Sequence, residues 1–356
     1  MKTDILITGT GSLAEEILFS LIKITSKNLS IHIFGRNIER LKWLKHVADL
    51  QNKMQNKEHQ VTFSYVPDWN KDSLVSALYP LEIELILHTA SVQSAWMLKS
   101  ENKWNSLVNK YGYGITTFLQ CHLAIKVGQA LASIGKNTPI INASYPDVTN
   151  FILHHLGIPV VAGIGNTSII DALLTTSQRI TSKADLFFYA HHYHISQLIQ
   201  GNIKNLPEIY YKNKQLDFFS FFPEFFKLPA DESLNKLTGF VAASQILSFL
   251  GVNEPYIGHM PGVNGLLGGQ PVQISKRKIE IRSFNKEALS FNQEKFKVLT
   301  KLEGINISEN SISFNNEFIQ DLQSLSITLP TQINLADTNT YSELFLNIKE
   351  SLSVQI

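Results

Sequence analysis

Gly9, Gly11 and Ala14 have the spacing of a turn that can hold a pyrophosphate group. The apolar run 4–8 precedes this turn, and residues 15–22 follow with apolar side chains at helical spacing. A glycine turn between strand and helix lets backbone approach the phosphates, while the helix N-terminus offers N–H donors and the positive end of its dipole. This context on both sides is what the motif requires. We therefore predict that a dinucleotide contacts Gly9, Thr10, Gly11, Ser12 and Leu13; the alternative is a tight turn without a ligand.

The end of the second predicted strand, residues 31–35, bears on which dinucleotide binds. An acidic residue at this position usually binds the adenosine ribose hydroxyls, whereas an arginine suits the 2′-phosphate of NADP. This strand ends in Gly35, Arg36 and Asn37, with no acid at its tip. Arg36 offers a planar, permanently charged guanidinium to a phosphate. We predict NADP(H) at these three residues and leave NAD(H) open; in the alternative, Arg36 is only a solvent-exposed residue at a helix entry.

The elements that position this turn alternate between strand and helix. Further strands are predicted at 61–66, 85–88, 138–142 and 159–162, with a helix near 72–78 and a long helical stretch over 105–134. This alternation indicates an α/β fold with a doubly wound parallel sheet. The second half lacks this regular alternation. Its pattern predicts a strand at 185–196, hairpins at 208–217 and 270–282, and helices at 168–180 and 234–250. We predict a Rossmann domain over 1–165 and an α+β substrate domain over 166–356.

Composition excludes several classes of partner. The 356 residues carry a formal net charge of +1, which gives no electrostatic reason to expect nucleic acid or an anionic membrane. Cys121 is the single cysteine, so an internal disulfide is excluded and a reducing compartment is favoured. No apolar run approaches the length of a membrane span. We expect a cytoplasmic protein that binds small molecules.

The order of several motifs resembles the lactate/malate dehydrogenase superfamily. The motifs are HTAS (88–91), SLVNK (106–110), NASYPDV (142–148), AHHYH (190–194) and GVNGLLGGQPVQ (262–273). The resemblance runs through most of the chain and implies a Rossmann domain followed by a lactate/malate dehydrogenase-like C-terminal domain. It adds four residues to the expected cofactor site, namely Thr89, Ala90, Ser91 and Asn142. It also implies association into a homodimer or homotetramer.

The resemblance further implies a histidine–aspartate pair that relays the proton of a substrate hydroxyl. His192 matches the histidine, and a neutral imidazole near pH 7 suits that role. An alignment without gaps puts Ile169 at the position of the family's aspartate, and Asp171, two residues later, is the candidate partner of His192. Lys103, on the loop that follows the strand 85–88, could assist. Alternatively, the histidines of 190–194 have no catalytic role and are polar residues of a core or a sheet edge.

The chain departs from the family where the substrate carboxylate binds. Trp104 occupies the position of the loop arginine, and Ala172 or Leu174 that of the clamp arginine. Without a planar fork, the family's 2-oxo acids should bind poorly. We expect NADP(H)-dependent reduction of a ketone or imine, or oxidation of the alcohol or amine, in a biosynthetic step. Composition alone suggests that an apolar pocket is lined by Trp96, Trp104 and the phenylalanine-rich segment 218–226, which could equally be core or subunit interface.

Two other functions stay open. On a strand, His192 and His194 would share a face and could hold a metal with Asp171, as in NAD- and manganese-dependent glycosidases. Those enzymes typically supply a cysteine at the turn that reads GIGNT here (163–167), so we expect no metal ligand. A catalytically inactive dinucleotide-binding protein is the third hypothesis. No function is assigned to the last 55 or so residues.

Overall fold

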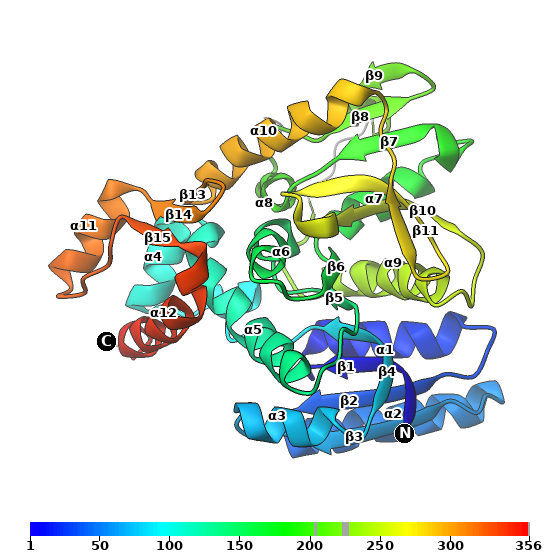
Figure 1. Ribbon diagram of the computed structural model, residues 1–356. Coiled ribbons are helices and arrows are strands. Elements are labelled where there is room, and N and C mark those ends of the chain that lie inside the picture. The colour runs from blue at the N-terminus through cyan, green and yellow to red at the C-terminus, as the bar shows by residue number, and fades with distance from the viewer. Residues whose placement is uncertain (203–204, 223–227, 355–356) are drawn as a thin grey trace.

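A six-stranded parallel sheet dominates the first half of the computed structural model, which describes residues 1–202, 205–222 and 228–354 (Figure 1). Its strands are β1 (Lys2–Thr8), β2 (Ser30–Gly35), β3 (Gln60–Tyr65), β4 (Glu82–His88), β5 (Ile140–Asn142) and β6 (Val160–Gly163). They lie in the order β3-β2-β1-β4-β5-β6, and neighbouring strands are parallel. The strand order reverses between β1 and β4, and ligands bind such sheets in the crevice at this point. The predicted α/β doubly wound fold is confirmed.

Different helices cover the two faces of the sheet, because side chains alternate along each strand. Ile5 and Ile7 belong to a core with α1 (Ser12–Ile24), α2 (Ile38–Gln55) and α9 (Leu234–Phe249). Leu6 and Ile86 point to the opposite core, with α3 (Lys71–Leu78), α5 (Thr117–Ser133) and α6 (Pro146–His155). Among the described residues, no helix combines the length and hydropathy needed to cross a bilayer.

The long helical stretch expected over 105–134 is interrupted. The structure has α4 (Lys103–Tyr111), a short 3₁₀ turn η2 (Tyr113–Thr116) and then α5. The break occurs at Gly112, whose φ of +106° is incompatible with a helix and disfavours any residue other than glycine. The interruption turns the chain so that Tyr113 faces the crevice of the sheet.

Among the described residues, the second half contains three small antiparallel sheets. They comprise β7 (Leu186–Tyr189), β8 (Glu208–Tyr211) and β9 (Lys214–Leu216); β10 (Tyr256–Pro261), β11 (Gly269–Ser275) and β12 (Lys278–Ile281); and β13 (Ile305–Ile307), β14 (Ser311–Phe314) and β15 (Gln332–Asn334). The two predicted hairpins are confirmed as β8–β9 and β11–β12. The helix predicted over 168–180 is shorter, α7 (Thr167–Thr176). The strand predicted over 185–196 is wrong beyond Tyr189, because α8 (His192–Gln200) begins three residues later.

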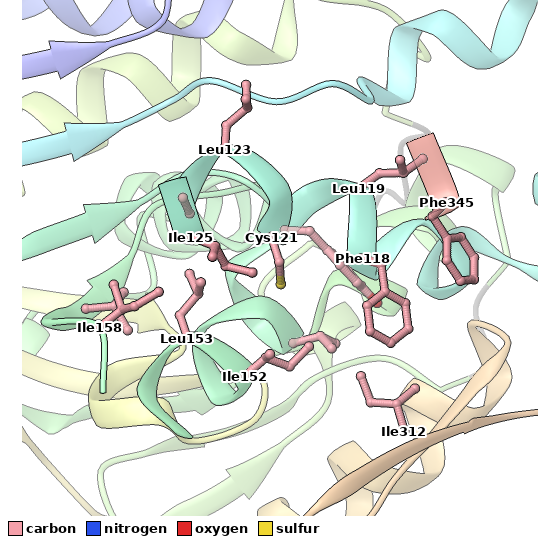
Figure 2. Packing of buried hydrophobic residues seen from close by; sticks show 14 of the residues in the cluster. Phe118, Leu119, Cys121, Leu123, Ile125, Ile152, Leu153, Ile158, Ile312 and Phe345 are labelled. Atoms are coloured by element: carbon pink, nitrogen blue, oxygen red, sulfur yellow. The ribbon is translucent and has the colours of Figure 1, made fainter. Parts of the chain in front are cut away.

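The C-terminal segment is an integral part of the first core. It consists of α10 (Lys286–Leu302), β13 to β15, α11 (Asn316–Ser324) and α12 (Thr338–Leu352). Figure 2 shows Phe118 and Leu119 of α5 packed beside Phe345 of α12, with Ile312 of β14 nearby. The rings of Phe118 and Phe345 stack with centroids 5.1 Å apart. The end of the chain is therefore fixed against the helix that follows η2.

Candidate functional site

A cavity of about 410 Å³ lies along the carboxyl ends of the parallel strands. Its wall runs from the ends of β1 and β2, past β4, to the β5–α6 turn and the start of α8. It contains every residue predicted to contact the cofactor except Asn142. The adenosine half of a dinucleotide lies by the first half of such a sheet and the nicotinamide half by the second.

The glycine turn is built as a pyrophosphate cradle requires. Gly9 has a φ of +119°, and a Cβ there would lie 2.6 Å from Thr89 Oγ1 and 2.9 Å from the backbone nitrogen of Ala90. Gly11 is the N-cap of α1, no side chain caps the helix, and a Cβ on Gly11 would meet only open space. The free N–H groups and the open approach fit a bound pyrophosphate.

Arg36 and Asn37 lie at the rim of this cavity. The side chain of Asn37 caps α2 by accepting the N–H of Arg40 at 3.0 Å. Arg36 is exposed, and the described part of the chain offers it no ion pair. A Cβ on Gly35 would lie 2.5 Å from Cγ2 of Thr10, so glycine keeps this edge of the pocket open. The guanidinium of Arg36 is therefore available to a ligand.

Asn142 lies beneath the cavity and not in its wall. Its side chain is fully buried and donates to Asn150 Oδ1 at 2.8 Å and to Thr149 Oγ1 at 2.9 Å. It also accepts the N–H of Ser144 at 3.0 Å. Asn142 thus shapes the β5–α6 turn, whose following residues, 143–147, line the cavity. The side chain of Asn142 therefore does not line the cavity, and the expected contact of Asn142 with a cofactor stays a prediction.

His192 is the first residue of α8 and lines the cavity. The helix begins here because two neighbouring histidines cap it reciprocally. His191 Nδ1 accepts the N–H of Tyr193, and His194 Nδ1 accepts the N–H of His191. Histidine is not among the usual capping residues, so this helix start could not be recognised in the sequence. The shared strand face that suggested a metal site with His194 does not exist.

The carboxylate that holds His192 is Glu303, the residue after α10. Nδ1 of His192 lies 2.6 Å from Oε1 of Glu303, whose side chain is 4% exposed. The hydroxyl of Tyr145 donates to Oε2 of Glu303 at 2.5 Å. Tyr113 stacks on the imidazole at a centroid distance of 5.1 Å, and Tyr145 meets it edge-on at 5.1 Å. The imidazole is therefore fixed in position and plane.

The two charges stabilise each other. Burial alone would lower the pKa of His192, but Glu303 and Asp147 more than offset this, and its pKa lies above the usual value. Burial alone would raise the pKa of Glu303, but His192 beside it holds that pKa below its usual range. The pair therefore favours an imidazolium next to a carboxylate, which is a proton donor in position beside the cavity.

Asp171 and Lys103 are not brought to this site. Asp171 is buried in α7, where its Oδ2 accepts the Tyr256 hydroxyl at 2.7 Å and the His259 N–H at 3.1 Å. Burial raises the pKa of Asp171 to about 6. Lys103 is the exposed first residue of α4 and is not part of the cavity wall. The expected pairing of Asp171 with His192 is corrected to Glu303, because α7 directs Asp171 towards β10.

The predicted aromatic lining is found in part. Trp96 lines the cavity, whereas Trp104 is fully buried and donates its Nε1–H to Gln93 Oε1 at 2.9 Å. Phe218 and Phe221 belong to the core formed by α7, α8 and β7 to β8. Residues 223–227 of the phenylalanine-rich segment lie outside the described residues.

Four residues of the site are absent from the sequence-based expectations, namely Tyr113, Tyr145, Asp147 and Glu303. Asp147 and Tyr145 lie in the NASYPDV motif, directly after a predicted strand, which is a usable signal. Tyr113 lies inside what reads as one helix. Glu303 is 111 residues from His192 along the chain, and no local pattern marks it.

No protein-family model matches the sequence, and no curated protein matches it. Among solved structures, a 6-phospho-alpha-glucosidase from gut microorganisms, in complex with NAD and glucose-6-phosphate, aligns over 100% of both chains. Its TM-score is 0.54 at 9% identity. The 6-phospho-beta glucosidase of Thermotoga maritima, with manganese, NAD⁺ and glucose-6-phosphate, covers 99% of each chain with a TM-score of 0.52 and 12% identity.

The apo malate dehydrogenase of Picrophilus torridus aligns over 85% of this chain and 96% of its own, with a TM-score of 0.54 and 13% identity. The chain thus has the fold shared by malate dehydrogenases and 6-phosphoglucosidases, with which the cavity at the carboxyl ends of the strands agrees. The resemblance inferred from the sequence motifs is confirmed at the level of the fold.

Proposed function

We propose that this protein is an NADP(H)-dependent oxidoreductase that reduces a ketone or imine, or oxidises the corresponding alcohol or amine. The arrangement that supports this function is His192 in the wall of the same cavity as the glycine turn. Malate dehydrogenases with this fold include one solved with NADH, from Archaeoglobus fulgidus. We further expect a homodimer or homotetramer in the cytoplasm.

Hydride transfer and proton transfer would be carried out by different groups in the proposed reaction. A bound nicotinamide dinucleotide supplies or accepts a hydride. His192 gives or takes the accompanying proton at Nε2, because Glu303 occupies Nδ1 and no described residue hydrogen-bonds Nε2. Glu303 keeps the imidazole oriented, and Tyr113 and Tyr145 pack against the ring. His192 is the catalytic acid–base residue in this proposal, and Glu303 is its positioning residue.

The glycine turn provides the first test. Gly11→Val places methyl groups in open space beside the uncapped start of α1, in a backbone conformation that valine adopts readily. We expect the variant to fold and to lose measurable binding of NADPH and NADH, because the side chain fills the phosphate approach. Isothermal titration measures binding, and thermal melting checks the fold. A Gly11→Val protein that melts like the wild type and still binds NADPH would contradict a cofactor at this turn.

Arg36 provides the test of cofactor preference. Arg36→Ala should weaken NADPH binding about 10- to 100-fold, the usual value of a charge-assisted contact to phosphate, and leave NADH binding unchanged. Lys42→Ala on α2, the helix that follows Arg36, is the control, because Lys42 pairs with Glu39 on the exposed surface. Tighter binding of NADH than of NADPH by the wild-type protein would overturn the assignment.

A glycosidase that uses both a metal and NAD is the second candidate, because two 6-phosphoglucosidases align along the whole chain. The histidine arrangement that suggested a metal is replaced by the caps of α8. The described residues contain no group of three or more His, Cys, Asp or Glu able to hold a metal. Metal analysis of protein purified without chelators is the test, and a stoichiometric transition metal would favour this candidate.

A further inference from the structure

Asp147 is a buried carboxyl group in the wall of the cavity. It is the second residue of α6, 1% exposed, and its Oδ1 accepts the backbone N–H of His192 at 3.0 Å. Its backbone oxygen accepts the N–H of Gly268 at 2.8 Å. The backbone N–H of Asp147 itself also hydrogen-bonds the carboxylate. No other described residue occupies Oδ2, which can accept a hydrogen bond from a ligand in the cavity.

The charges of the cavity wall are unevenly distributed. Among the described residues that line it, Arg36, Asp147 and His192 are the ones with ionisable charge near neutral pH. Arg36 follows β2, at the adenosine half of such a sheet, whereas Asp147 and His192 lie at the half that receives the nicotinamide. Glu303 is directly behind His192. At the reacting end, the described wall thus has the carboxyl group of Asp147 and the imidazole of His192, and no arginine or lysine. Behind this wall, Oε2 of Glu303 lies 3.7 Å from Nδ1 of the buried His191.

We propose that Asp147 determines specificity by binding a cationic nitrogen, so that the substrate is an iminium ion or the corresponding amine. This inference rests on the proposed oxidoreductase function and selects the imine from its two substrate classes. A carboxylate substrate would face Asp147 and find no described arginine or lysine at this end of the cavity to pair with. An iminium nitrogen gains a charge-assisted hydrogen bond to Oδ2.

The step balances without a further reactant. A neutral imine takes a proton at nitrogen from the His192 imidazolium, and Asp147 binds the iminium ion that this transfer forms. The carbon of the resulting C=N bond accepts a hydride, the π pair of that bond moves to nitrogen, and a neutral amine and the oxidised dinucleotide are formed. His192 regains its proton from solvent. Oxidation of the amine is the same sequence in reverse.

A purely structural role does not account for the carboxyl group. The N–H of His192 needs only one acceptor oxygen, which an asparagine amide would supply at the same place. A buried carboxylate with a single hydrogen bond to another residue is costly, and the His192 imidazolium, which also pairs with Glu303, offsets this cost only in part. Burial raises the pKa of Asp147 to about 7, and Glu303 adds to this while His192 opposes it. A bound cation would favour the ionised form.

The test compares three probes that share a cyclopentane ring and differ in charge. Cyclopentylamine, cyclopentanol and cyclopentanecarboxylate are titrated calorimetrically into the full chain saturated with NADP⁺. We expect the amine to bind at least about 10-fold more tightly than the other two, as one charge-assisted hydrogen bond implies. In parallel, 2-methyl-1-pyrroline should be reduced by NADPH faster than 2-methylcyclopentanone, and pyruvate should not be reduced.

Asp147→Asn keeps the acceptor for His192 and removes the charge. We expect this variant to lose the preference for cyclopentylamine, about 10- to 100-fold, with unchanged binding of cyclopentanol and NADP⁺. Asp185→Asn, on the exposed surface, is the control and should bind all probes like the wild type. The wild-type probe series does not depend on whether the variant folds.

Three results would overturn the inference: no binding of the amine, equal or tighter binding of the alcohol or carboxylate, or an amine preference that survives Asp147→Asn. Failure of the proposed function is distinct, because it appears as absent binding of both NADPH and NADH. In that event the same titrations without dinucleotide decide the role of Asp147. An amine preference that depends on Asp147 would then stand as a binding site without hydride transfer.

Discussion

Glu303→Gln is expected to lower the pKa of the His192 imidazole and to reduce turnover about 100-fold or more, a usual effect of impaired general acid–base catalysis. The pKa falls because burial, which disfavours the imidazolium, remains while the main opposing charge is lost. Asp147 still favours the imidazolium and limits the fall. Nuclear magnetic resonance of histidine labelled with ¹⁵N measures this pKa directly and needs no substrate.

The activity profile should shift in the same direction. In carbonyl or imine reduction, protonated His192 is the active form, so the rate declines as pH rises through the pKa of His192. In Glu303→Gln this decline moves to lower pH. Glu309→Gln is the control, because Glu309 is exposed on the same C-terminal segment. An unchanged His192 pKa in Glu303→Gln would show that the contact does not control the imidazole.

The free energy of unfolding should depend on pH through the pair of His192 and Glu303. His192 has a raised pKa in the folded state, so its contribution is complete below its unfolded value of about 6.5 and is lost as pH rises through the folded value. Glu303 has a lowered pKa, so its contribution is present above about 4.5 and is lost as pH falls through the folded value. Urea unfolding should therefore separate wild type from Glu303→Gln most clearly between about pH 4.5 and 6.5.

Gly112→Ala is expected to lower the free energy of unfolding by about 3 kcal/mol or more, since backbone strain and overpacking add. Gly112 has a φ of +106°, and a Cβ there would lie 2.6 Å from the backbone carbonyl atoms of Glu303. The neighbouring Gly114 donates its N–H to the oxygen of Glu303 at 2.7 Å. The chain cannot move aside without displacing the carboxylate that holds His192.

Gly135→Ala is the control that separates backbone strain from overpacking. Gly135 also has a positive φ, +65°, but a Cβ there would have no neighbour within 4 Å. We expect its cost to stay near 1 kcal/mol, the strain of a left-handed residue alone. Urea unfolding of both variants gives the comparison. Equal stability of the two would mean that the contact between Gly112 and Glu303 is not tight.

Local patterns were sufficient to predict the backbone of the glycine turn and the position of Arg36 beside it. The strand, glycine turn and helix of residues 4–22 are contiguous in the sequence. Their local pattern of apolar residues and glycines is therefore enough to predict each element. The same holds for the strand of 31–35, whose end places Arg36 at the rim of the cavity. The parallel sheet followed from the alternation of such units.

The surroundings of His192 could not be predicted from local patterns. The start of α8 depends on two histidine rings that accept backbone N–H groups, and the apolar pattern before it is equally typical of a strand. Asp171 has the expected type and spacing, but α7 directs it to Tyr256. Glu303 meets His192 only because α10 ends against the turn at Gly112, a contact between distant parts of the chain.

The position of Glu303 in the sequence also means that it is synthesised after the residues that it holds in place. A chain made only as far as residue 302 already contains the glycine turn, Asp147 and His192, but not the carboxylate that holds the imidazole. The segment that fixes Glu303 packs through Ile312 and Phe345, which are made still later (Figure 2). The glycine turn and the imidazole are therefore synthesised before the carboxylate and the segment that hold the imidazole in place.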